Sequence, residues 1–191
     1  MKDDILIGDT PKAQKRRRRV KKMSAAGRLW KHSKLSDIDG LLGDQDTRDF
    51  FVFTLVRNPW DRMVSYYHWL KEQKFDHAAV DVAKTNGFSS FLSHPHMLRS
   101  IGGENYGHYM CDHEGRERCD LFIRIEHLNA DIAPLENHLG FRLGPIERVN
   151  RSDRAQDYRA YYTASDCELV GKLFETDIDR FGYDFDGDAP R

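Results

Sequence analysis

The segment that most constrains the fold is a strand-length run of apolar and β-branched residues that stops at an arginine and a proline. The run is residues 50–56, FFVFTLV, and Arg57, Asn58 and Pro59 follow it. Side chains of this kind at every position are typical of a strand covered on both faces, as in a parallel sheet with helices on each side. Pro59 cannot donate to a strand ladder, and Asn58 or Asp61 can cap a helix. The run therefore predicts a buried strand that ends at a tight turn.

A helix is expected directly after this turn. From Trp60 onward apolar residues recur with helical spacing, at Met63, Val64, Tyr67 and Leu70. A strand that leads into a helix through a short turn directs free backbone N–H groups, and the positive end of the helix dipole, beyond the strand's carboxyl end. That arrangement favours a bound anion.

Two side chains of this unit suit a phosphate. Arg57 can make a two-pronged contact with phosphate oxygens. Ser65, expected about one helical turn past the start of the helix, can donate its hydroxyl to the same group. The alternative is a structural Arg57 that pairs with Asp61 or another nearby carboxylate.

The rest of the chain predicts one more buried strand and several helices. The strand is residues 121–125, LFIRI. Helices are expected at residues 37–42 after a Ser36 cap, at 88–98 from Ser89 or Ser90, near 130–139 up to Gly140, and last after Thr163 or Ser165. No repeat or long linker divides the chain, so we expect a single domain over residues 1–191, with 1–34 as a loosely organised basic arm.

Composition excludes some classes of protein. With 191 residues, 39% hydrophobic and 12% aromatic, the chain suits one ordered domain and not general disorder. No stretch approaches the roughly 20 apolar residues of a membrane span. The first residues lack the basic start and apolar run of a secretion signal, so we expect a cytoplasmic protein.

Charge is balanced overall but not along the chain. Residues 1–34 hold 12 Lys and Arg against Asp3, Asp4 and Asp9, a local net charge of +9. An arm of this kind suits a polyanionic partner, whether nucleic acid, a sulfated or phosphorylated substrate, or a membrane surface. The alternative is a solvated helix face.

Four potential metal ligands fall within one short segment: His108, Cys111, His113 and Cys119. Their spacing matches no common zinc site, because no Cys-x-x-Cys pair is present. We expect a polar hairpin there, and no metal.

Residues 50–70 closely resemble the 3'-phosphate-binding segment of sulfotransferases, particularly the carbohydrate-type enzymes. The shared residues are Val-Arg-Asn-Pro, then an arginine after a pair of variable residues, and then a helix with Val-Ser-Tyr-Tyr. Later segments resemble the family in order: DLFIRIEHL at 120–128, Asn-Arg-Ser at 150–152 with the tyrosines that follow, and DIDRFGY at 177–183. The resemblance covers about residues 30–185.

The resemblance implies a three-layer α/β fold like that of P-loop nucleotide kinases, with a parallel sheet flanked by helices. The protein would be a bacterial-type sulfotransferase whose donor is 3'-phosphoadenosine-5'-phosphosulfate. Its acceptor would be a hydroxyl or amine of a carbohydrate-like, possibly anionic, molecule. By the family pattern Arg57 and Ser65 hold the 3'-phosphate. Arg151 is a further candidate for the nucleotide, with a surface arginine in a loop as the alternative. His32 lies where related enzymes place a base histidine, with a solvated histidine as the alternative.

One departure from the family concerns the loop Pro-Lys-x-Gly-Gly-Thr, which cradles the donor's 5'-phosphosulfate. Residues 8–12, GDTPK, have the residue types in the wrong order. We expect that Met1 is an internal start and that an additional strand and loop precede it. Two alternatives to the enzyme follow: a non-catalytic nucleotide-binding member of the family, and a nucleic-acid-binding protein that uses the KRRRR run. The second leaves Arg57 and Ser65 unexplained, so nucleic acid is the less favoured partner.

Overall fold

The computed structural model describes residues 8–29, 32–41, 49–102, 105–146 and 154–187, which fall into two compact units. The first unit joins the chain up to Thr54 with Tyr106–Leu121. The second joins Leu55–Asn105 with the chain from Phe122 onward. The single domain expected over residues 1–191 stays a prediction.

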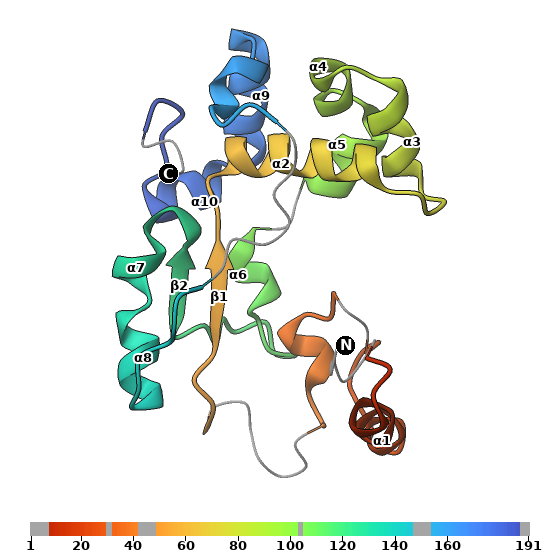
Figure 1. Cartoon of the computed structure of the whole chain (residues 1–191), viewed down its shortest axis with the longest axis vertical. Helices are drawn as coiled ribbons and strands as arrows, with labels where there is room; N and C mark the ends of the chain where they lie inside the picture. The colour runs from red at the N-terminus through yellow and green to blue at the C-terminus, as the bar shows by residue number, and fades with distance from the viewer. Residues whose placement is uncertain (1–7, 30–31, 42–48, 103–104, 147–153, 188–191) are drawn as a thin grey trace. The chain divides into compact units, whose positions relative to one another are not determined.

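The described residues hold a small parallel sheet of two strands, β1 (Phe53–Val56) and β2 (Leu121–Arg124), drawn side by side in Figure 1. Both strands lie within the apolar runs that predicted them. Helices flank the sheet, which confirms the mixed α/β class. The three-layer arrangement of P-loop kinases stays a prediction.

The expectation that the first strand is covered on both faces is wrong for the described chain. Phe53 and Leu55 are 43% and 49% exposed, whereas Val56 is fully buried. Successive side chains of a strand point to opposite faces, so Phe53 and Leu55 share one face. In the part of the chain that the structure describes, that face is left open to solvent.

The central helix of the second unit is α2 (Pro59–Glu72). It begins as the sequence predicts, because the Asn58 side chain accepts hydrogen bonds from the first free N–H groups and Pro59 occupies the first turn. Its predicted apolar face is buried: Trp60, Met63, Val64, Tyr67 and Leu70. Burial of each large side chain contributes about 1.5–3 kcal/mol, so this face anchors the unit's core.

Further helices pack on α2, and Figure 1 shows α9 and α4 above it. They are α3 (Ala78–Thr85), α4 (Phe88–Leu92), the 3₁₀ turn η4 (Tyr158–Tyr161) and α9 (Ala164–Leu173). A further helix, α5 (Pro95–Ile101), packs on α3 and α4. The single helix expected at 88–98 is wrong: it is two helices, and the first begins after Gly87 instead of at a serine. Pro95 causes the break, because proline lacks the N–H that a continuous helix needs and instead starts α5.

Beyond β2 the chain forms η3 (Ile125–His127), α7 (Leu128–Asp131) and α8 (Ala133–Leu139). The helix expected near 130–139 is thus two short helices, and it ends as predicted at Gly140, which has a φ of 75°. Thr163 caps α9 as predicted. That helix is not the last, because α10 (Glu175–Phe181) follows and ends at Gly182.

The first unit contains α1 (Pro11–Val20), the 3₁₀ turn η1 (Leu35–Ile38) and α6 (Tyr106–Tyr109). The loosely organised arm is therefore wrong for residues 11–20, where Thr10 caps a regular helix that carries the arginine run. The helix expected at 37–42 is a single 3₁₀ turn that starts at Leu35, and residue 42 lies outside the described residues. Among the described helices none is long and apolar enough to cross a membrane.

Candidate functional site

The turn between β1 and α2 is fixed by the buried side chain and backbone of Asn58. Its Oδ1 accepts from the N–H groups of Trp60 (3.0 Å) and Asp61 (3.4 Å), and its Nδ2 donates to the carbonyl of Asp184 (3.2 Å). Its own N–H donates to Glu126 Oε1 at 2.7 Å. Because these bonds tie three separate segments to one residue, the start of α2 has a single defined geometry.

Asp61 lies in the first turn of this helix and binds two arginines. Its side chain is fully buried. Oδ2 accepts from Arg57 Nε at 2.6 Å and Nη2 at 2.5 Å, and Oδ1 accepts from Arg154 Nη2 at 2.6 Å. The Arg57 side chain is 23% exposed and that of Arg154 8% exposed. The structure therefore shows the pairing of Arg57 with Asp61 that the sequence left open as an alternative, and adds Arg154 to it.

This cluster of Arg57, Asp61 and Arg154, here called the arginine clamp, has an excess of positive charge. Two guanidinium groups remain cationic at any physiological pH, and one carboxylate balances only one of them. The clamp also lies at the start of the 14-residue α2, where the helix dipole adds positive potential. A surplus cation beside a helix N-terminus is suited to an anion with several acceptor oxygens.

Ser65 lies on the same side of α2 as Asp61. The two are four residues apart, so their side chains share a helix face at a rise of about 6 Å. Ser65 is half-buried and stands nearly two turns into the helix, instead of the one turn expected from the sequence. Asp61 thus bonds Arg57 and shares a helix face with Ser65.

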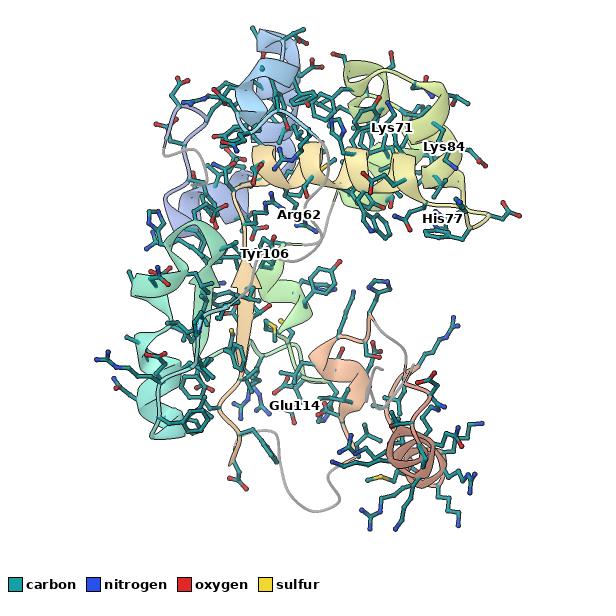
Figure 2. The ribbon with its side chains drawn as sticks, viewed as in Figure 1. Arg62, Lys71, His77, Lys84, Tyr106 and Glu114 are labelled. Carbon is teal, nitrogen blue, oxygen red and sulfur yellow. The ribbon has the colours of Figure 1, made fainter. Side chains whose placement is uncertain are left out.

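Arg62, an arginine of α2 itself, is not part of the clamp. Arg62 projects from the first half of α2, as Figure 2 shows, and its guanidinium lies over the ring of Phe174 at 5.7 Å from the ring centre. Residue 62 is offset from Asp61 by one position, so it lies on a different side of the helix. Its contact with an aromatic ring ties α2 to the end of α9.

Two tyrosines fasten the segment after Arg154 to the same turn. Tyr158 donates to the carbonyl of Phe185 at 2.6 Å and accepts from Asn58 Nδ2 at 3.4 Å, and burial raises the pKa of Tyr158 to about 12. Tyr162 donates to the carbonyl of Trp60 at 2.9 Å, and burial raises its pKa as well. The tyrosine-rich stretch therefore packs against the start of α2 and carries Arg154 with it.

The structure does not test the other two predicted site residues. His32 is an exposed residue of the first unit, whereas Arg57 and Ser65 belong to the second, so its role as a base stays a prediction. Arg151 lies outside the described residues. Sequence reasoning missed Asp61 as a shared partner and missed Arg154. The available signals were the four-residue spacing of Arg57 and Asp61 and the position of Arg154 just before the tyrosines.

The segment with four potential metal ligands forms the expected hairpin. An antiparallel bridge joins Cys111 to Glu117, and the N–H of Asp112 donates to the carbonyl of Arg116 at 2.9 Å. The His113 ring bonds Asp39 at 2.6 Å, which raises the pKa of this histidine. In the described residues no three His, Cys, Asp or Glu side chains gather as they would around a metal ion.

Comparison with known proteins gives one match. The model of the sulfotransferase family matches residues 7–184, which is most of the chain and includes β1, α2 and the arginine clamp. Searches of curated proteins and of solved structures found no significant match. Because the match spans far more than half of the sequence, this chain belongs to the sulfotransferase family.

Proposed function

We propose that this protein transfers a sulfuryl group from 3'-phosphoadenosine-5'-phosphosulfate to a hydroxyl, or an amine, of a carbohydrate-like acceptor. Membership of the family supports sulfuryl transfer as the reaction class. The observation that supports the choice of donor is the cationic start of α2. Arg57 follows β1 directly, and Ser65 lies on the same face of α2 as Asp61, the partner of Arg57. The donor bears a 3'-phosphate that such a site would hold.

The described residues fit this part of the donor. Arg57 keeps 23% of its side chain exposed, so a phosphate oxygen can reach it while Asp61 holds its Nε. The Ser65 hydroxyl, one turn beyond Asp61, would donate to the same phosphate. We further propose Arg151 as a contact for the nucleotide, on the strength of the family resemblance.

The chemistry asked of the protein is mainly positioning. Sulfuryl transfer resembles phosphoryl transfer, in which an in-line displacement through a loose transition state depends on orientation and charge stabilisation. The bond from sulfur to the donor's bridging oxygen breaks as the bond to the acceptor oxygen forms. The acceptor's proton must leave, and we propose His32 as the base that takes it.

Ligand-dependent thermal unfolding tests the donor assignment. The chain is unfolded with and without adenosine 3',5'-bisphosphate, and with 5'-AMP as the control that lacks the 3'-phosphate. Ligand at about 100 times its dissociation constant adds ~2.7 kcal/mol of stability, which raises the melting temperature by several degrees. A shift with the bisphosphate alone supports the assignment, whereas equal shifts or no shift contradict it.

Transfer itself is measured with isotopically labelled donor and a panel of neutral and sulfated saccharides. A labelled product that gains one sulfate supports the enzyme. Binding of the bisphosphate with no product on any saccharide would favour a second candidate, a nucleotide-binding member without transfer chemistry. The sequence feature that motivates this second candidate is the departure of residues 8–12 from the family's phosphosulfate loop.

A further inference from the structure

We propose that Arg154 is a second arginine that contacts the bound anion, and that Asp61 is the residue that positions Arg154 and Arg57 for it. This inference deepens the proposed function and rests on it where the anion is named as the 3'-phosphate of the donor. No sequence motif pointed to Arg154. The inference rests on the bonds that Asp61 makes with Arg57 and Arg154 at the start of α2.

The first observation is a buried donor of Arg154 that lacks a partner. The side chain is only 8% exposed, and its Nη2 donates to Asp61 Oδ1 at 2.6 Å. Its Nη1 is buried and has no hydrogen-bond partner among the described residues. Buried polar groups of folded proteins are nearly always paired, so an exception at a charged side chain calls for an explanation. A ligand oxygen that accepts from Nη1 would supply the missing partner.

The second observation is the charge of the arginine clamp. Asp61 already has a close partner in Arg57, which reaches Oδ2 through both Nε and Nη2. Arg154 is therefore not needed to neutralise the carboxylate, and its charge is surplus. A surplus cation held away from water is unfavourable on its own and becomes favourable when an anion binds beside it.

The third observation is the way Asp61 divides its two oxygens. Oδ2 holds Arg57 and Oδ1 holds Arg154, so one carboxylate keeps two mutually repelling guanidinium groups on either side of it. Asp61 comes from the first turn of α2 and Arg154 from a segment 93 residues later that the tyrosines fasten to the same helix. A phosphate with three free oxygens can accept from both arginines at once.

The test compares Arg154→Gln with Arg159→Gln. Arg159 is the matched control, because it is an arginine of the same segment that pairs with exposed Asp157 at 2.8 Å, away from the clamp. Dissociation constants are measured by calorimetry for adenosine 3',5'-bisphosphate and for inorganic pyrophosphate. We expect Arg154→Gln to raise the dissociation constant of the bisphosphate by roughly tenfold or more, and Arg159→Gln to change it by less than about twofold. Unchanged binding by Arg154→Gln overturns the inference.

Arg154→Lys guards against a variant that fails to fold. Lysine keeps the charge beside Asp61 but lacks the planar fork, so it should fold and bind with a smaller loss than glutamine. Binding by Arg154→Lys that equals the parent, together with a misfolded Arg154→Gln, would assign Arg154 a structural role and overturn the inference.

A double-mutant cycle with Asp61→Asn separates contact from charge balance. If Arg154 only neutralised Asp61, the loss caused by Arg154→Gln would vanish in the Asp61→Asn background. If Arg154 contacts the anion, Arg154→Gln weakens binding in both backgrounds. Asp61→Asn alone should also weaken binding, because Arg57 and Arg154 lose their shared anchor.

The two probes keep this inference separate from the donor assignment. Should the parent bind pyrophosphate but show no preference for the bisphosphate over 5'-AMP, the donor assignment fails and Arg154 is still tested with pyrophosphate. Should the parent bind the bisphosphate, and Arg154→Gln bind it equally well, only the inference fails. A parent that binds neither probe contradicts both.

Discussion

The backbone N–H of Asn58, at the end of β1, donates to the carboxylate of Glu126, which follows β2, at 2.7 Å. One hydrogen bond thus joins the carboxyl ends of the two paired strands beside the arginine clamp. Arg124, two residues before Glu126, bonds Asp131 through Nε at 2.8 Å and Nη2 at 3.0 Å. Glu126 is therefore not part of the Arg124–Asp131 pair, and its carboxylate accepts the hydrogen bond from the turn between β1 and α2.

Replacement of Glu126 should destabilise the fold more when the acceptor oxygen is removed than when it is kept. Glu126→Ala leaves the Asn58 N–H without its acceptor, and we expect a loss of about 1.5–3 kcal/mol in the free energy of unfolding, as for hydrogen bonds to charged groups. Glu126→Gln keeps an acceptor oxygen and should cost less than about half of that. Urea unfolding measures both, and equal stability of Glu126→Ala and the parent would contradict this role.

Arg57→Gln should weaken the binding of adenosine 3',5'-bisphosphate more than Ser65→Ala does. A charge-assisted bond contributes roughly 1.5–3 kcal/mol and a neutral one about 1 kcal/mol, which correspond to losses of about 10–150-fold and about fivefold. Affinity for 5'-AMP should change little in either variant, because 5'-AMP lacks the 3'-phosphate. Parallel losses for both nucleotides would instead place the two residues elsewhere on the ligand or in the folding of α2.

Acid should destabilise the second unit in part through Asp166, the first-turn residue of α9. Burial alone would raise the pKa of this carboxyl, but bonds from Ser89 Oγ at 2.6 Å and Thr163 Oγ1 at 2.7 Å hold it below the usual 3.8. A carboxyl with a lowered folded-state pKa contributes stability above its unfolded value, and that stability is lost as pH falls through the folded value.

Ser89→Ala should therefore lower stability at neutral pH and lose less of it on acidification below about pH 4. Thermal unfolding from pH 6 to pH 2 checks this, with Ser93→Ala as a control, since the Ser93 hydroxyl donates to a carbonyl of its own helix at 3.0 Å. Identical pH curves for Ser89→Ala and the parent would rule the effect out.

Alkali should act through Tyr158. Burial raises its pKa from 10.0 to about 12, so the folded protein keeps the phenol proton that the unfolded chain begins to lose near pH 10. A raised folded-state pKa means stability that is complete below pH 10 and declines as pH rises toward 12. Tyr158→Phe should be less stable at pH 8, because the bond to Phe185 is gone, yet show a shallower decline above pH 10. Absorbance of tyrosinate during pH titration checks the assignment.

The features of α2 show which parts of the structure could be predicted from the sequence. The cap at Asn58, the proline in the first turn and the 3.6-residue spacing are local signals, so the start of α2 and its buried face could be predicted. The end at Gly140 could be predicted in the same way, since glycine readily adopts the positive φ that this residue has in the structure. Local chemistry was sufficient wherever one residue determines a boundary.

Features that depend on long-range contacts could not be predicted, because the sequence signals used are local. The cap of α3 is His77, whose ring nitrogen accepts from the Ala79 N–H at 3.2 Å, and histidine is not a usual cap. The bond between Arg154 and Asp61 spans 93 residues, and no local pattern pairs these two residues with each other. Exposure of Phe53 and Leu55 likewise depends on which elements cover a face, whereas periodicity reports only that the face is apolar.

The role of His32 is separable from donor binding. As the base that accepts the acceptor's proton, His32 acts in the chemical step, so His32→Ala should lower turnover by ~100-fold or more. Its affinity for adenosine 3',5'-bisphosphate should match the parent, because the 3'-phosphate is assigned to Arg57 and Ser65. Turnover is measured with labelled donor at saturating acceptor, and binding by calorimetry on the same preparation. Equal losses in both would indicate a folding defect, and full turnover would remove His32 from the mechanism.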